Sequence, residues 1–179
     1  MGFQSSIFYG LVTWLPTLLE DDGMAPATAG WMLALMQFSS LVSTTLVPSL
    51  AARRADQVGI VVVSVLLAWL GLGGLAVLGS AVAPMSVILA GLGSGALFSL
   101  ALTFLVLRAA DVTHAAALSG MAQTGGYLVA AAGPIGLGAL HDSSGGWGWP
   151  VVALMLVTAG ALAAGLGAAR AAQVGPPAG

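Results

Sequence analysis

The sequence predicts an all-α membrane protein, a bundle of six transmembrane helices. Long apolar runs alternate with short polar loops throughout the chain. Apolar residues make up 59% of the 179 residues, whereas charged residues make up only 6%. A soluble domain has about 25% charged residues, so the surface of this chain suits lipid better than water. A helix also satisfies its own backbone hydrogen bonds, as a segment surrounded by lipid must.

Each apolar run is long enough to cross a bilayer, which takes about 20 residues at 1.5 Å per residue. We expect one transmembrane domain over residues 1–170 and a short disordered tail over 171–179. The first run has no positive flank before it, as in a membrane helix whose beginning is missing. The expected spans cover approximately 1–19, 28–51, 58–78, 84–107, 115–140 and 151–169.

The loops contain residues that favour helix ends. Pro26 suits the first turn of the second helix and Thr28 can cap it. Asp111 and Thr113 are natural caps for the fifth helix. We expect residues 141–150 to form a polar turn whose tryptophans lie at the depth of the lipid headgroups.

The arginines predict the orientation of the helices. All four follow the second, fourth or sixth run, and in short loops such residues stay in the cytoplasm. The acidic residues 20–22 and the pair at 141–142 fall in the opposite set of loops. The predicted location is therefore the bacterial inner (plasma) membrane with both termini cytoplasmic. The cytoplasmic charges are Arg53, Arg54, Arg108 and Arg170.

Several classes of function are excluded. Four arginines and no lysine cannot form a basic patch for nucleic acid. The absence of cysteine excludes disulfides and thiolate metal sites, and we expect neither a metal nor a cofactor. The stretch 91–95 resembles a dinucleotide loop but follows no strand. Ser94 resembles the nucleophile of six-helix intramembrane proteases. Both histidines of this chain lie at helix ends and none lies in the sixth run, so Ser94 has no base to activate it. The chain is not expected to be an enzyme.

Small residues in two runs are assigned to helix packing. Gly91 and Gly95 lie four residues apart on one helical face, where a neighbouring backbone can approach closely. Gly133 and Pro134 in the fifth run are assigned to packing as well.

Uncharged polar and aromatic residues gather on single helical faces. In the fifth run, the residues that share a face are Ser119, Gln123 and Tyr127. In the first run they are Ser5, Tyr9 and Thr13, with Gln4 and Phe8 beside them and Trp14 further along, and Gln37 is the strongest polar group of the second run. Amides in hydrocarbon are costly unless paired, so these side chains either line a cavity or join helices by hydrogen bonds. The histidines His114 and His141, each near an aspartate, are interpreted as caps of helix ends. No charged residue lies in the middle of a run, so this chain offers no proton relay.

The order of several strings resembles the C-terminal half of a major facilitator transporter of the cyanate and 2-nitroimidazole permease family. The resemblance covers nearly the whole chain, although the loop 51–56 lacks the usual Asp-Arg step of the facilitator signature. The strings are FYGLVTWLP from Phe8, GWMLALMQ from Gly30, GLGSGALFSLALT from Gly91, AAALSGMAQ from Ala115, and YLVAAAGP from Tyr127, followed by LHD at Leu140 and GGW at Gly145.

This resemblance implies half of a twelve-helix major facilitator fold, with the six spans corresponding to helices seven to twelve. Two such halves alternate access to a site near the middle of the membrane. Spans one, two, four and five would line that site, which adds Ser94 and Phe98 to the candidate residues. Amide, phenol and aromatic groups suit a small, flat, neutral or delocalised solute.

The resulting hypothesis is transport of a small solute by the C-terminal half of such a permease. The expected partners are the lipid bilayer, a small-molecule solute, and either a separate N-terminal six-helix half or a second copy. Two alternatives remain open at this point: a homodimeric six-helix transporter and a non-catalytic accessory subunit of a membrane complex.

Overall fold

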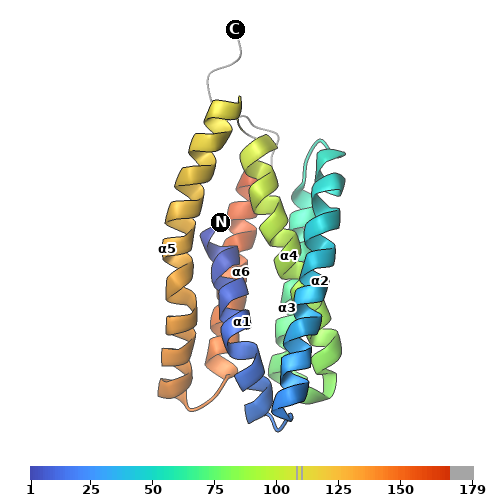
Figure 1. Ribbon diagram of the computed structural model, residues 1–179, viewed down its shortest axis with the longest axis vertical. Helices are drawn as coiled ribbons and strands as arrows, with labels where there is room; N and C mark the ends of the chain where they lie inside the picture. The colour runs from blue at the N-terminus through green and yellow to red at the C-terminus, as the bar shows by residue number, and fades with distance from the viewer. Residues whose placement is uncertain (108, 110, 170–179) are drawn as a thin grey trace.

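The computed structural model describes residues 1–107, 109 and 111–169, and in these residues the chain forms six α-helices and one short 3₁₀ helix. Successive helices run in opposite directions along one bundle (Figure 1). The bundle has an Asp21 end, where α1 finishes, and an Arg53 end, where α2 finishes. The helices are α1 (Gly2–Asp21), α2 (Pro26–Ala52), α3 (Val58–Leu78), η1 (Gly79–Val82), α4 (Ala83–Leu107), α5 (Val112–Ser144) and α6 (Gly148–Ala169).

The helix bounds follow the expected runs and differ from them at several loops. The α2 helix begins at Pro26, the earlier of the two starts that the sequence offered, and the short link after α3 forms the 3₁₀ helix η1, which leads directly into α4. The loop predicted over 141–150 shrinks to residues 145–147. The expected tail 171–179 lies outside the described residues.

The α5 helix is longer than the span 115–140 because its two ends are well capped. The Asp111 carboxylate accepts a hydrogen bond from the His114 backbone N–H at 2.9 Å, which confirms it as the N-cap. At the other end, the Ser143 and Ser144 hydroxyls donate to the Leu140 carbonyl within the last turn of the helix. Gly145 then takes the left-handed conformation, φ 69°, that ends it.

The interior holds two apolar clusters, one toward each end of the bundle. The cluster toward the Asp21 end includes Leu15, Leu19, Met36, Leu72 and Val87. The cluster toward the Arg53 end includes Val47, Val61, Ala96, Leu100 and Phe104. The two clusters hold the helices together at both ends.

The helix contacts follow a repeating pattern. The α2 helix packs against α4 as α5 packs against α1, and α3 packs against α4 as α6 packs against α1. The α3 and α6 helices also contact each other. Exchanging α1–α3 with α4–α6 converts the first four of these pairs into one another and leaves the α3–α6 pair unchanged. The two three-helix units therefore pack in a related arrangement, although α5 contacts α6 more extensively than α2 contacts α3.

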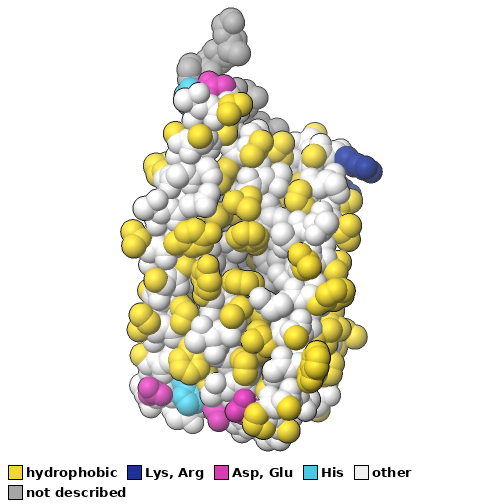
Figure 2. Space-filling model, in the orientation of Figure 1, with side chains coloured by type: hydrophobic (Ala, Val, Ile, Leu, Met, Phe, Trp, Pro, Cys, Tyr) yellow, Lys and Arg dark blue, Asp and Glu magenta, His cyan; other side chains and the backbone are white. Residues whose placement is uncertain are grey.

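The outer surface is suited to lipid. Three helical stretches of the described residues are long and apolar enough to cross a membrane: Pro26–Ala52, Val58–Leu107 (which contains α3, η1 and α4) and Gly148–Ala169. Large apolar side chains are exposed on these helices, including Phe38, Leu70, Val77 and Leu156. Charged side chains gather at the ends of the bundle and leave a broad uncharged band between them (Figure 2).

Candidate functional site

A cavity of about 290 Å³ lies between α1, α2, α4 and α5. Residues one helical turn apart provide its walls: Gln4 and Phe8 on α1, and Gln37 and Leu41 on α2. Tyr127 approaches from α5. The complete lining is Gln4, Ser5, Phe8, Tyr9, Gln37, Ser40, Leu41, Thr44, Phe98 and Tyr127. We call this space the amide-aromatic cavity.

The structure brings six of the nine candidate residues to this cavity and places three elsewhere. The six are Gln4, Phe8, Tyr9, Gln37, Phe98 and Tyr127. The Trp14 indole N–H instead donates to the Pro134 carbonyl at 2.8 Å, joining α1 to α5. The Ser94 hydroxyl bonds back to the Gly91 carbonyl in its own helix. The Gln123 amide donates to Ser119 at 2.7 Å and does not line this cavity.

Four residues that the sequence analysis had not proposed as cavity lining also face the cavity. Ser40, Leu41 and Thr44 extend the helical face of Gln37 along α2, and Ser5 neighbours Gln4. Continuing the spacing of three to four residues from Gln37 would have found Leu41 and Thr44. The Thr44 hydroxyl donates to the Gly95 carbonyl at 3.2 Å, so this side chain also joins α2 to α4.

The two glutamine amides are incompletely paired. Gln4 Nε2 donates to Ser5 Oγ at 2.7 Å, but Gln4 Oε1 is buried and has no hydrogen-bond partner among the described residues. Gln37 Oε1 is also buried and has no hydrogen-bond partner among the described residues. Buried polar atoms in proteins are nearly always paired, so two unpaired oxygens at one cavity are unusual.

The aromatic rings form another part of the wall. The Phe8 and Tyr9 rings meet edge to face with centroids 5.5 Å apart, and Tyr9 meets Tyr127 at 6.5 Å. Tyr9 and Tyr127 also border a second cavity of about 370 Å³ that reaches Thr13 and Pro134. The tyrosine pair therefore stands between two spaces along the α1–α5 seam.

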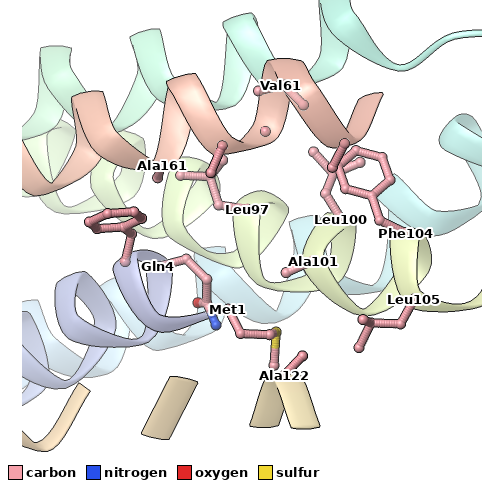
Figure 3. Close-up of a pocket in the computed structure, with 14 residues that line it drawn as sticks. Met1, Gln4, Val61, Leu97, Leu100, Ala101, Phe104, Leu105, Ala122 and Ala161 are labelled. Atoms are coloured by element: carbon pink, nitrogen blue, oxygen red, sulfur yellow. The ribbon is translucent and has the colours of Figure 1, made fainter. Parts of the chain in front are cut away.

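A further cavity of about 280 Å³ lies toward the Arg53 end and is almost wholly apolar. Leu97, Leu100 and Phe104 of α4 line it, and Met1 and Gln4 lie on its α1 side (Figure 3). Gln4 is the only amide in its lining, so this space offers little polar recognition. Gln4 borders both this cavity and the amide-aromatic cavity.

The glycines assigned to packing lie where backbones approach. A side chain at Gly91 would clash with the Met36 carbonyl, and one at Gly95 would clash with the Ser40 carbonyl, both on α2. Gly133 faces the Ser6 backbone of α1. These contacts hold α2 against α4, and α1 against α5, around the amide-aromatic cavity.

The Asp21 end is joined by polar contacts between loops. The Trp147 indole N–H donates to Asp21 Oδ2 at 2.8 Å, and the His141 ring lies 4.3 Å from the Trp147 ring, centroid to centroid. His141 Nε2 is 3.6 Å from the same Asp21 oxygen. The Asp22 carboxylate accepts a hydrogen bond from the Ser80 backbone N–H, which lowers the pKa of Asp22 below its usual value. Two loop contacts therefore fasten the end of α1.

At the Arg53 end, the predicted charge positions are described only in part. Arg53 and Arg54 are exposed in the loop after α2, whereas Arg108 and Arg170 lie outside the described residues. The Asp111 carboxylate also meets the His114 ring at 2.9 Å, and hydrogen bonds from His114 lower the pKa of Asp111. Within residues 1–107, 109 and 111–169, no three His, Asp or Glu side chains gather as a metal site would require.

Comparison with known proteins shows what the chain resembles. It is 46% identical to the uncharacterized transporter YycB of Bacillus subtilis (strain 168) over 171 residues, covering 95% of this chain and 42% of that protein. It is 38% identical to the 2-nitroimidazole transporter of Escherichia coli (strain K12) over 158 residues, covering 88% and 40%. The chain is homologous to bacterial transporters.

A third relative is the putative anionic 4-hydroxy-benzoate permease of Thauera aromatica, 45% identical over 80 residues that cover 45% of this chain and 49% of that protein. The chain thus spans less than half the length of the curated relatives it matches. No family model matches the chain, and no solved structure matches it significantly. These relatives are transporters and not enzymes. Together with the apolar helices, they indicate an integral membrane protein.

Proposed function

We propose that this chain is one half of a major facilitator permease that carries a small solute across the membrane by alternating access. In this proposal all six helices span the bilayer, and they correspond to the C-terminal half of a twelve-helix transporter. The membrane is the bacterial inner membrane, and the Arg53 end of the bundle, with both termini, faces the cytoplasm.

The packing of the helices supports the assignment to a permease half. Each six-helix half of a major facilitator contains two three-helix repeats, which alternate in orientation across the membrane. The related packing of α1–α3 and α4–α6 in this bundle is the arrangement that such repeats produce. The identity to transporters over about 40% of their length agrees with a part of a larger permease.

The observation that favours transport most is the amide-aromatic cavity. Its walls come from α1, α2, α4 and α5, the four helices that the family resemblance assigns to the solute path. Amides and aromatic rings, without a charged side chain in the lining, suit a small flat solute that is neutral or has a delocalised charge.

The exposure of the cavity lining favours a second six-helix unit as partner. Tyr9, Leu41 and Tyr127, which line the cavity, are exposed on the bundle surface. A facing half would cover these side chains and enclose the solute between the two units. A separate N-terminal half and a second copy of this chain would both do so.

The membrane arrangement can be tested with single cysteines, because the natural chain contains none. In intact cells, a membrane-impermeant maleimide should label Gly146→Cys at the outer turn and should label Ala55→Cys only after permeabilisation. Labelling of both positions from outside would contradict the proposed topology.

Translation of the DNA on both sides of this coding sequence distinguishes the two possible partners. Six further spans in frame favour a single twelve-helix chain.

Transport itself is tested by counterflow, which does not depend on the natural direction of transport. The protein produced from its complete reading frame is reconstituted in vesicles preloaded with 2-nitroimidazole, the solute in the name of one relative. Labelled 2-nitroimidazole should accumulate transiently above the level in protein-free vesicles. Equal levels for this probe and for a panel of small flat solutes would refute the proposed function.

A further inference from the structure

The unpaired amide oxygens indicate what the cavity recognises. Gln4 is only 4% exposed, and its Nε2 is engaged by Ser5, so its Oε1 is held in the interior without a donor. Gln37 Oε1 is likewise buried without a donor, and no hydrogen bond of the Gln37 side chain occurs among the described residues. Both side chains line the amide-aromatic cavity.

In the absence of a ligand, these buried oxygens lower the stability of the protein. A buried carbonyl oxygen without a donor loses its hydration and gains nothing in return. A leucine at either position would carry no unpaired oxygen. Two such oxygens at a single cavity are therefore better explained as acceptors for a ligand than as contacts between helices.

The neighbouring groups restrict which ligand fits. Among the residues that the structure describes, the cavity lining contains no arginine, lysine or histidine to neutralise an anion. Carbonyl oxygens repel an anionic ring and attract an N–H group. The Phe8, Tyr9, Phe98 and Tyr127 rings provide faces and edges against which a planar ring can pack.

We infer that Gln4 and Gln37 determine the specificity of the cavity by accepting hydrogen bonds from N–H groups of a planar, uncharged solute. The terminal torsion of a glutamine is soft, so a small rotation turns each oxygen toward the solute. The site accordingly selects the protonated, N–H-bearing form of a heteroaromatic ring over its anion or its N-alkyl derivative. This inference rests on the proposed transport function.

The test compares two probes that differ in one donor, 2-nitroimidazole and 1-methyl-2-nitroimidazole. Counterflow competition is measured for both probes with the protein from its complete reading frame. The unsubstituted protein should prefer the N–H probe by about fivefold, the effect of one neutral hydrogen bond. Because 2-nitroimidazole has a single N–H that the two oxygens share, Gln4→Leu and Gln37→Leu should each lower this ratio, and the double variant should bring it close to one. Because the ratio is taken within each variant, differences in yield cancel.

Matched variants separate recognition from damage to the fold. Gln123→Leu is the same chemical change at an amide that is paired with Ser119 and does not line the cavity, so it should keep the fivefold ratio. Gln37→Met preserves the length of the side chain and should lower the preference as Gln37→Leu does. It replaces Gln37→Leu if that variant fails to fold.

The possible results lead to different conclusions. If the unsubstituted protein transports both probes equally, or if the Gln4 and Gln37 variants keep its preference, the inferred recognition is wrong while transport stands. If the protein transports neither probe and no other flat solute, the proposed function fails and the inference fails with it. An equal loss of preference in Gln123→Leu would also overturn the assignment to these two residues.

Discussion

At position 37, an amide oxygen is buried among membrane helices and has no hydrogen-bond partner among the described residues. Replacing Gln37 by leucine removes that unpaired atom and keeps an apolar contact. We expect the free energy of unfolding to stay unchanged or to rise by about 1 kcal/mol, because no hydrogen bond is lost. Thermal unfolding of the purified protein in detergent measures this effect.

Thr44 provides the matched comparison, because it lines the same cavity and its hydroxyl is paired with the Gly95 carbonyl. Thr44→Val should lower the stability by about 0.6 kcal/mol, the mean for hydrogen bonds between membrane helices. A loss of stability in Gln37→Leu as large as that in Thr44→Val would mean that Gln37 holds helices together.

Two residues that the sequence analysis expected in the cavity bind hydrogen-bond acceptors elsewhere. Trp14 was expected in the cavity, but its indole N–H has a strong acceptor in the Pro134 carbonyl on α5. Ser94 was expected there too, but a helical hydroxyl can satisfy itself on its own backbone, as it does with Gly91. Residue type alone does not reveal which partner such a donor finds across a helix interface.

At the scale of helices, the close approach of α2 and α4 depends on glycine. A Cβ at Gly95 would clash with the Ser40 carbonyl, which belongs to the backbone of α2 and cannot turn away. Gly95→Ala should therefore destabilise the bundle by about 1–3 kcal/mol, the usual cost of overpacking. Thermal unfolding in detergent again provides the measurement.

Gly120 on α5 is the control for that substitution, because nothing lies within 4 Å of an added Cβ. Gly120→Ala should be neutral or stabilising by up to about 1 kcal/mol, since alanine favours a helix. Similar losses in both variants would show that α2 and α4 do not pack as closely as described.

The contact between Asp22 and Ser80 predicts a dependence on pH. The hydrogen bond from the backbone N–H of Ser80 lowers the pKa of Asp22 below the ordinary aspartate value of 3.8. A carboxylate with a lowered pKa in the folded state contributes stability above its unfolded pKa and loses it as the pH falls through the folded value. The melting temperature should therefore decrease on acidification below about pH 4, and this decrease should be smaller in Asp22→Asn. Parallel curves for the two proteins between pH 5 and pH 3 would contradict this role.

Helix positions could be predicted from the sequence better than helix rotations. The apolar runs located the six helices of the described residues, and the bounds moved at the capped ends Asp111 and Gly145, at Pro26 and in the link after Leu78. The rotation of each helix was harder, because both lipid and protein interior are apolar and the usual amphipathic pattern is weak. Only polar residues such as Gln37 and Tyr127 indicated a face, which is why the apolar Leu41 was missed.

At the scale of the whole molecule, the bundle combines an outer surface suited to lipid with the amide-aromatic cavity. The two apolar clusters and the loop contacts at the Asp21 end hold the two three-helix units together. The cavity lies where α1, α2, α4 and α5 meet, and the sequence had indicated those four helices through the family resemblance. Composition predicts neither the identity of the solute nor that of the partner unit. Both depend in part on side chains that the facing unit would supply.

The central claim, that solute passes through the amide-aromatic cavity, is tested most directly by a single cysteine at Leu41. This side chain is 62% exposed and lines the cavity, and the natural chain has no cysteine to react in its place. Val63 on α3 is 54% exposed and does not line the cavity, so Val63→Cys is the control.

The measurement is the rate of maleimide modification of Leu41→Cys with and without 2-nitroimidazole, together with counterflow before and after modification. Our account predicts that the solute slows modification at position 41 and that the modified protein no longer transports, whereas Val63→Cys shows neither effect. Full counterflow after complete modification of Leu41→Cys, at a rate of modification that the solute does not change, would contradict it.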